Sequence, residues 1–336
     1  MSNITGTKQD GGHGLRRQLV NGVWFGATSF EERCIGSLRE LKQRGIRLRA
    51  VIVINYVKPQ PNSTENEKRK NTNTSLLTEI GNEVADQVIV VNQTPYSFPG
   101  ICTALQNVLT EFKKTPLLLD LSCFTRMHII ALSDFISLAG SKHHISLAYT
   151  SPENYSTFRA KPRDAWKDLL IFPLGEPKGG GHDEIPSRGI ILPGHEGDRL
   201  QLSLAEAEPS GGSILIADTP QRPDWRHACE RRNASVINRL TSSALSDWRI
   251  ERVTYGRMKH VSAIVQVEVD HALTSGSCPA VVFPFGPKWM LFAATSQLSR
   301  KYRDHTWFVY AVPTKHDDYS EGVGATLWSL YRPPRN

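Results

Sequence analysis

The sequence has no apolar run long enough to cross a membrane. Its best candidates, LLLDLSCF at 117–124 and IIALSDFISLA at 129–139, stop well short of the roughly 20 apolar residues that a membrane helix needs. The first 18 residues, MSNITGTKQDGGHGLRRQ, contain no apolar core of a secretory signal. We therefore expect a cytoplasmic protein without a membrane partner.

Cysteine is sparse and scattered. No C-x-x-C pair occurs among Cys34, Cys102, Cys123, Cys229 and Cys278. An odd count without regular spacing is typical of reduced thiols rather than of a disulfide framework. Metal sites need clustered ligands, and the short stretch KHH at 142–144 does not supply them. The sequence thus predicts no metal site.

The standard catalytic motifs are missing as well. The chain has no G-x-x-x-x-G-K-[ST] phosphate loop, no G-x-S-x-G nucleophile, no H-E-x-x-H zinc motif and no kinase set. A G-x-G at Gly322 and Gly324 is not followed by a predicted helix, so it does not fit a dinucleotide-binding fingerprint. Catalytic residues therefore stay unassigned, and the sequence favours a binding protein over an enzyme.

What the chain does have is the composition of a globular protein with a basic surplus. Its 336 residues suit two domains of roughly 150 residues each. Hydrophobic residues make up 39% of the chain and charged residues 22%, which is typical of a folded protein. The net charge of +7 fits a phosphate-bearing ligand, a nucleic acid or an acidic partner, and equally a solubilising surplus, because the basic residues are dispersed.

Short β-rich runs alternate with amphipathic stretches in the first half. The predicted strands cover 22–27, 48–56, 87–92, 115–122 and 144–150. The predicted helices cover 30–45, 75–86, 98–113 and 126–140. This alternation predicts a parallel sheet with helical crossovers. Residues 58–74 are polar and predict a mobile loop.

The stretch GEPKGGGHDEIPSR at 175–188 predicts a Gly/Pro linker, and the alternation restarts after it. The second-half strands are predicted at 189–194, 213–218, 248–255, 279–285 and 306–312, with a last strand at 324–332. The predicted fold class is α/β, with two tandem, internally duplicated Rossmann-like parallel-sheet domains. They would span 20–174 and 189–336, after a disordered N-terminal tail at 1–19.

Two sequence patterns recur in the same order in both halves. ERCIGSLRE at 32–40 returns as DRLQLSLAE at 198–206, and YTSPENYS at 149–156 returns as YAVPTKHDDYS at 310–320. Arg33 precedes Tyr149 by 116 residues, and Arg199 precedes Tyr310 by 111. Two patterns in register indicate that the halves are copies of one α/β unit.

Polar residues follow the first-half strands where ligands of open parallel sheets bind, beyond the carboxyl ends. The candidate ligand-binding residues there are Ser29, Arg33, Asp120, Ser122, Thr125 and Arg126. An aspartate that ends an apolar strand is costly unless it is hydrogen-bonded or exposed in a cleft. The alternatives are a helix cap at Asp120 and a surface ion pair at Arg33.

The second half offers matching candidates, namely His195, Arg199, Gly286 and Lys288. A lysine at a helix start opposes the helix dipole, so either a ligand phosphate or a neighbouring carboxylate should compensate it. Tyr155 and Tyr319 end the two repeated loops, where an aromatic face can stack on a base. Ordinary loop packing is the alternative for both tyrosines.

Two Rossmann-like halves with polar strand ends resemble the CARF and SAVED sensors of bacterial antiviral systems. The resemblance covers about residues 20–330 and lies in the architecture, not in a diagnostic motif. It implies a nucleotide or cyclic oligonucleotide as ligand, held between the two halves by both copies of the motifs. Because such sensors usually carry an effector domain that is not recognised here, it also implies a protein partner with an effector activity.

Two other functions stay open at this point. Paired Rossmann halves also resemble sugar-nucleotide glycosyltransferases, and single ones resemble nucleosidases and phosphoribosyl-transfer enzymes. In such an enzyme Asp120 would be the acid–base or ribose-binding group, with Lys288 and Arg199 on the phosphates. The third hypothesis is a non-catalytic interaction subunit that uses the duplicated fold for its surface.

Overall fold

The computed structural model describes residues 19–57, 64–139, 144–155, 166–176, 187–195, 197–243, 246–274, 280–313 and 320–331. Within these ranges the chain forms two compact units, each built on one mostly parallel sheet flanked by helices. The predicted α/β class with two Rossmann-like sheets is therefore confirmed. The predicted tail at 1–19, apart from Leu19, and most of the predicted linker at 175–188 lie outside the described residues.

Unit 1 is assembled from three stretches, Met1–Phe124, Lys142–Glu153 and Gly322–Arg332. In its described part the sheet has the order β14-β5-β4-β1-β2-β3. The strands are β1 (Val23–Ala27), β2 (Ala50–Tyr56), β3 (Val88–Gln93), β4 (Leu117–Asp120), β5 (Ile145–Thr150) and β14 (Thr326–Tyr331). The helices are η1 (Glu32–Ile35), α2 (Gly36–Gln43), α3 (Glu65–Val84) and α4 (Phe98–Glu111).

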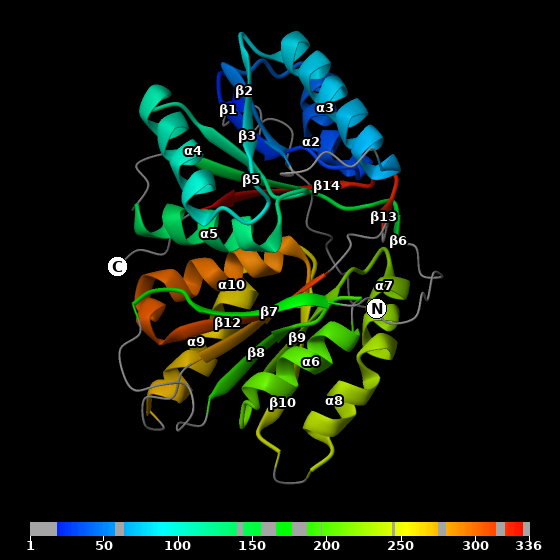
Figure 1. Ribbon diagram of the computed structural model, residues 1–336, viewed down its shortest axis with the longest axis vertical. Helices are drawn as coiled ribbons and strands as arrows, with labels where there is room; N and C mark the ends of the chain where they lie inside the picture. The colour runs from blue at the N-terminus through cyan, green and yellow to red at the C-terminus, as the bar shows by residue number, and fades with distance from the viewer. Residues whose placement is uncertain are drawn as a thin grey trace, which may run out of the picture. The chain divides into compact units, whose positions relative to one another are not determined.

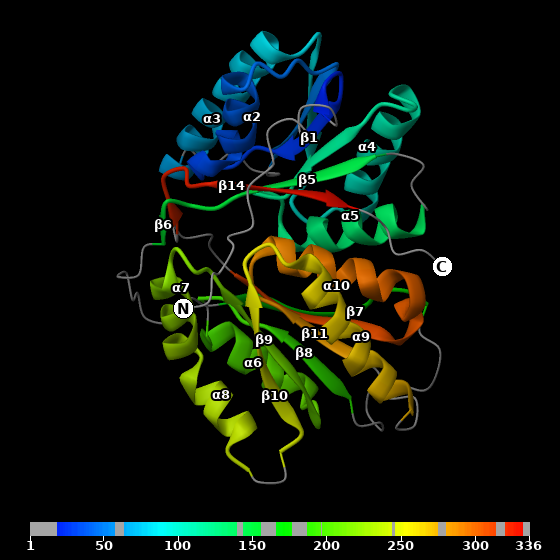
Figure 2. The ribbon, with the colours of Figure 1, turned by 180° about the vertical axis from the view of Figure 1, so that it is seen from behind.

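Helices cover both faces of the sheet in unit 1. Trp24, Val51 and Val53 point to the face where α2 and α3 lie, and they form one apolar core with Leu38 and Leu77. Helix α4 lies on the opposite face (Figures 1 and 2). Because both faces are covered, β1 and the first five residues of β2 are buried throughout, as their near-continuous apolar sequences predict.

Helix α3 begins ten residues earlier than the sequence predicts. The hydroxyl of Thr64 caps it by accepting a hydrogen bond from the backbone N–H of Glu67. Further along, the Lys70 ammonium donates to the Tyr56 carbonyl at 2.7 Å, and the Asn73 amide donates to the Ser29 carbonyl at 2.9 Å. The predicted loop is thus wrong for residues 65–74. Lys70 and Asn73 are the buried residues of this stretch, and their polar groups bond to backbone carbonyls rather than to an apolar core.

Unit 2 is assembled from Thr125–Ser141, Asn154–Glu321 and Pro333–Asn336. In its described part the main sheet has the order β10-β9-β8-β11-β12-β7. Its strands are β7 (Trp166–Pro173), β8 (Arg188–Leu192), β9 (Gly211–Asp218), β10 (Trp248–Thr254), β11 (Ala280–Pro284) and β12 (Thr306–Pro313). The helices are α5 (Arg126–Leu138), α6 (Gly197–Ala207), α7 (Pro223–Arg232), α8 (Ala234–Thr241), α9 (Met258–Thr274), α10 (Lys288–Lys301) and η2 (Arg303–His305).

The two sheets have the same strand order. Strands β1 to β5 run in the order 3-2-1-4-5, and β8 to β12 repeat it. This match supports the interpretation of the halves as copies.

Each sheet ends in an antiparallel sixth strand, and these two strands are exchanged. The strand that follows β5 in the main sheets is β7, and it pairs with β12. The strand that follows β12 there is β14, and it pairs with β5. The continuous boundaries expected at 20–174 and 189–336 therefore do not coincide with the compact units.

Helix α5 packs on α10 through small polar residues. The Ser133 hydroxyl donates to the Phe292 carbonyl at 2.9 Å, and one turn later the hydroxyls of Ser137 and Ser296 are 2.9 Å apart. Small side chains bring the two helix backbones close together. Buried residues occupy every position of α5 from Met127 to Ser133, whereas Leu138 at its end is exposed.

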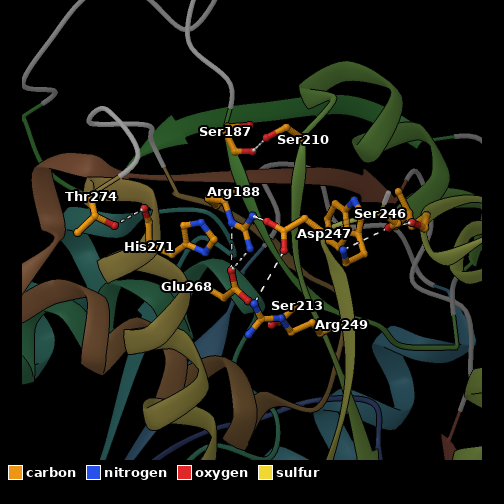
Figure 3. Close-up of polar contacts among 12 residues, drawn as sticks. Ser187, Arg188, Ser210, Ser213, Ser246, Asp247, Arg249, Glu268, His271 and Thr274 are labelled. Atoms are coloured by element: carbon orange, nitrogen blue, oxygen red, sulfur yellow. Dashed lines mark hydrogen bonds and ion pairs between the residues drawn. The ribbon is translucent and has the colours of Figure 1, made fainter. Parts of the chain in front are cut away.

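A buried ionic network closes the amino-terminal edge of the sheet in unit 2 (Figure 3). The Arg188 guanidinium donates through Nε and Nη2 to one oxygen of Glu268, at 3.1 and 2.7 Å. Its Nη1 contacts Asp247, and the Ser213 hydroxyl donates to the other Glu268 oxygen. Arg188 and Glu268 are almost fully buried. The network joins β8, β9, α9 and the start of β10, at the edge away from the ligand-binding loops of such folds.

Across the described ranges, no helix is long and apolar enough to cross a membrane.

Candidate functional site

In a sheet of order 3-2-1-4-5 the first and fourth strands are parallel neighbours, and the strand order reverses between them. Ligands of this fold bind beyond the carboxyl ends of that pair. In unit 1 these strands are β1 and β4, and in unit 2 they are β8 and β11. Asp120 ends β4, and Gly286 and Lys288 follow β11. The surroundings of these strand ends differ between the units.

In unit 1 the strand-end aspartate is bonded on both oxygens. Oδ1 of Asp120 accepts from the backbone N–H of Ser122 at 2.8 Å and from the Ser122 hydroxyl. Oδ2 accepts from the Ser37 hydroxyl, which itself accepts from the Trp24 indole at 3.0 Å. The Ser122 hydroxyl also accepts from the backbone N–H of Thr150 at 2.8 Å. These contacts tie β1, α2, β4 and β5 together.

Arg33 and Ser29 are likewise engaged within unit 1. The Arg33 guanidinium forms an ion pair with Glu31 at 2.9 Å and lies 3.5 Å from the Tyr149 hydroxyl. The Ser29 hydroxyl accepts from the backbone N–H of Glu31 at 3.2 Å. The ion pair expected as the alternative for Arg33 is present, but it is buried rather than on the surface.

In unit 2 two glycines bring the loops after β8 and β11 into backbone contact. A Cβ at Gly194 would overlap the Phe285 carbonyl oxygen, and a Cβ at Gly286 would crowd Leu192. Only glycine permits this approach. Lys288 then begins α10 and is partly exposed.

Two arginines converge on the aromatic residues beside this contact. The Arg199 guanidinium lies 5.4 Å from the Phe285 ring centre and 5.2 Å from that of Tyr310, and its Nε donates to the Ala311 carbonyl at 2.8 Å. The Arg126 guanidinium donates to the Phe285 carbonyl at 2.7 Å and lies 6.0 Å from the Tyr310 ring. We call Arg126 and Arg199 the arginine pair.

A cluster of partly exposed rings lies at the same strand ends of unit 2. The Tyr155 ring is 4.7 Å from the His195 ring and 4.8 Å from the Trp225 ring, which it meets edge-on at 77°. The Arg222 guanidinium covers the Trp225 ring at 4.6 Å. We call Tyr155, His195 and Trp225 the aromatic cluster. His195 follows Gly194 directly, so one loop joins the cluster to the arginine pair.

The structure holds Tyr155 in place through the repeated loops themselves. Strand β6 (Asn154–Tyr155) pairs with β13 (Ser320–Glu321), with Tyr155 opposite Ser320. The two copies of the repeated loop are therefore bonded to each other. Tyr319 lies outside the described residues.

The structure brings together some predicted residues and not others. Arg126, Tyr155, His195, Arg199, Gly286 and Lys288 belong to unit 2. Ser29, Arg33, Asp120 and Ser122 belong to unit 1 and are held by its internal bonds. Thr125 serves as the N-cap of α5 by accepting from the backbone N–H of His128 at 3.2 Å.

Sequence reasoning missed Trp225 and Arg222. The available signal was the stretch RPDWR at 222–226, where a tryptophan in the first turn of a helix is flanked by arginines.

Two buried thiols lie beside these loops, where Cys34 contacts the Ser29 carbonyl and Cys229 the Gly194 carbonyl. Burial raises the pKa of Cys229 to about 12. Burial, together with contact with Cys123, raises the pKa of Cys34. Both thiols are therefore protonated and weakly nucleophilic at neutral pH. Among the residues that the structure describes, no group of three His, Cys, Asp or Glu side chains is placed to hold a metal ion.

No profile of a known protein family matches the sequence. A search of curated proteins likewise finds no match.

A search of solved structures finds similar chains. A type III CRISPR defence DNA nuclease activated by cyclic oligoadenylate aligns with a TM-score of 0.50 at 9% identity, over 85% of this chain and 65% of its own. Can2 from Sulfobacillus thermosulfidooxidans in complex with cyclic tetra-adenylate aligns with a TM-score of 0.29 at 13% identity, over 39% of this chain and 32% of its own. A universal stress protein from Archaeoglobus fulgidus aligns with a TM-score of 0.24 at 9% identity, over 88% of this chain and 97% of its own.

The chain thus spans about two thirds of the nuclease and about one third of Can2. At these identities the likeness to the nuclease concerns the fold, and the two lower scores add nothing to it.

Proposed function

We propose that this chain is a sensing or binding subunit for a nucleotide or a cyclic oligonucleotide, and that the ligand binds at the carboxyl ends of β8 and β11 in unit 2. The observation that carries the proposal is that the loop after β8 contributes His195 to the aromatic cluster and, through Gly194, contacts Phe285, the residue on which the arginine pair converges. Guanidinium groups recognise phosphate, and aromatic rings stack on bases. A ligand with both chemistries is a nucleotide.

Unit 2 suits this role better than unit 1. In unit 1 the corresponding position beside β4 is filled by Asp120 and its hydrogen-bonded serines. A buried carboxylate would repel phosphate, whereas the loops of unit 2 offer glycine backbone at Gly194 and Gly286. The ligand is therefore assigned to the second copy.

A role in antiviral defence is supported by the fold of the nuclease, whose activator is a cyclic oligoadenylate. In this proposal a separate protein partner carries the effector activity. The enzyme hypothesis loses its acid–base group, because both oxygens of Asp120 already accept hydrogen bonds in a buried position. The interaction-subunit hypothesis predicts no nucleotide affinity at all.

Calorimetric titration with cyclic tetra-adenylate, adenosine monophosphate and ATP tests the proposal. Binding should weaken as salt rises, because screening reduces the attraction between guanidinium and phosphate. Arg126→Ala should weaken it roughly 5- to 150-fold, the scale of a lost charge-assisted hydrogen bond. Arg231→Ala, which removes the same charge from an exposed position on α7, is the matched control.

Identical titration curves for the wild type, Arg126→Ala and Arg231→Ala would place the site elsewhere. No binding of any of the three probes would favour the interaction-subunit hypothesis.

A further inference from the structure

We infer that the aromatic cluster is a nucleobase subsite in which Trp225 is the stacking residue and Arg222 is a cover that the base displaces. The inference rests on the proposed function and names the part of the ligand that this surface takes. Three separate segments, β6, the loop after β8 and the first turn of α7, supply the rings of the cluster. All three rings are partly exposed. The Phe285–Tyr310 pair below them is buried and serves the core.

The Trp225 indole has an unmet hydrogen bond. Its Nε1 is covered from solvent and donates to no acceptor in the part of the chain that the structure describes. A covered donor without a partner costs roughly 1–3 kcal/mol, so native proteins seldom keep one without a reason. The N–H bond lies in the plane of the indole, so its acceptor must approach the ring edge. A nucleotide supplies both partners, because its base can stack on the face of the indole while a ribose oxygen reaches the edge.

Arg222 marks the face of the indole that the base would occupy. Its guanidinium lies 4.6 Å from the Trp225 ring centre and forms two 3.1 Å contacts with Asp224, which is itself largely exposed. An exposed cation–π contact is worth only about 0.5–1 kcal/mol. Stacking a base is worth more, at roughly 1–3 kcal/mol. The base therefore replaces the guanidinium, which becomes available to the ligand phosphate.

The first test is a thermodynamic cycle between the base and the indole. The probes are adenosine monophosphate and ribose 5-phosphate, which share the phosphate and sugar but differ in the base. The wild type should prefer adenosine monophosphate by roughly 5- to 150-fold. In Trp225→Ala this preference should vanish, while the affinity for ribose 5-phosphate should change much less. Trp225→Phe keeps a stacking ring without the N–H donor, so most of the preference should remain.

Tyr96→Ala removes an exposed aromatic residue from unit 1 and is the control for surface truncation. Melting temperatures of all variants show whether the fold is kept. If Trp225→Ala retains the full preference for adenosine monophosphate, the subsite is wrong while the proposed function stands. If the wild type binds adenosine monophosphate and ribose 5-phosphate equally, the subsite is also wrong. If it binds neither of them nor cyclic tetra-adenylate, the proposed function falls, and the subsite with it.

The second test separates the two roles of Arg222. Arg222→Ala should weaken the binding of adenosine monophosphate several-fold, because a phosphate contact is lost. The same variant should bind adenosine as well as the wild type or better, because the base no longer displaces a guanidinium from Trp225. Weaker binding of adenosine would show that Arg222 supports the stacking surface instead of covering it, and would overturn this part of the inference.

Discussion

The Ser37 hydroxyl donates a hydrogen bond to Oδ2 of Asp120, 83 residues further along the chain. In the repeated sequence pattern Ser37 corresponds to Ser203, which is equally buried. Yet the Ser203 hydroxyl has no hydrogen-bond partner in the described structure. The registers of β4 on β1 and of β11 on β8 place Pro284 where unit 1 has Asp120. The copies thus share a strand order but not the polar network at the strand ends.

This difference predicts that substitution by alanine changes the stability of the protein differently at Ser37 and at Ser203. Ser37→Ala removes the donor to a buried carboxylate and the acceptor of the Trp24 indole, so it should destabilise the protein by roughly 1–3 kcal/mol. Ser203→Ala removes a buried hydroxyl without a partner and should be neutral or stabilising. Urea unfolding of the two variants measures this. Equal losses at both positions would contradict the assigned network.

The contacts of Arg199 predict that a lysine cannot replace it. Its planar guanidinium lies near two aromatic rings and is almost fully buried, whereas an ammonium group keeps the charge but not the plane. We expect Arg199→Lys to lose roughly 0.5–2 kcal/mol of stability in thermal unfolding. At the exposed Arg231 the same change to lysine should shift the melting temperature little. A fully stable Arg199→Lys would show that only the charge matters.

Removing only one partner of the ionic network in Figure 3 should strongly destabilise the protein. Glu268→Ala leaves the Arg188 guanidinium buried beside the Ser213 hydroxyl without their shared acceptor. Loss of one partner of a buried pair costs roughly 3–5 kcal/mol. The double variant Arg188→Met with Glu268→Leu should recover most of that loss, because apolar side chains of similar size need no partner. Chemical denaturation measures both, and a double variant as unstable as Glu268→Ala would refute this account.

Asp247 should contribute to the acid sensitivity of unit 2. Its hydrogen bond with Arg188 lowers the pKa of Asp247 below the ordinary value in the unfolded chain, which is about 3.9. The stabilisation is thus fully present above that unfolded value and is lost as pH falls through the lower folded value. Unfolding midpoints measured from pH 6 down to pH 2 should fall less steeply for Asp247→Asn than for the wild type. Parallel curves would mean that Asp247 does not respond to Arg188.

The pairing of β14 with β5 predicts which strand a C-terminal deletion exposes. Removal of residues 322–336 deletes β14 and leaves the β5 edge of the first sheet unpaired. Hydrogen exchange should therefore rise in β5, at Ile145–Thr150, while β12 stays protected by β7. Increased exchange confined to β12 would contradict the observed pairing.

The sequence by itself predicted the five parallel strands of each sheet and β14, but not β7 or the first ten residues of α3. The apolar runs that form these strands are local signals in the sequence. A strand that is buried on both faces is apolar along its length, whatever its position in the sheet. The sequence also suggested the hypothesis that the halves repeat each other, because Arg33 and Arg199 stand at similar distances before Tyr149 and Tyr310. The contact between each arginine and its tyrosine agrees with that register.

Only the tertiary structure decided which sheet the sixth strands join, because β7 and β14 both follow a copy of the same strand and nothing local distinguishes their partners. Only long-range contacts explain why α3 extends over polar residues from Glu65 onward. They also decide that Arg126, which follows the first stretch of unit 1, lies beside Phe285 with Arg199. The sixth strands and Arg126 are placed by residues more than a hundred positions away, where no periodic pattern of the sequence extends.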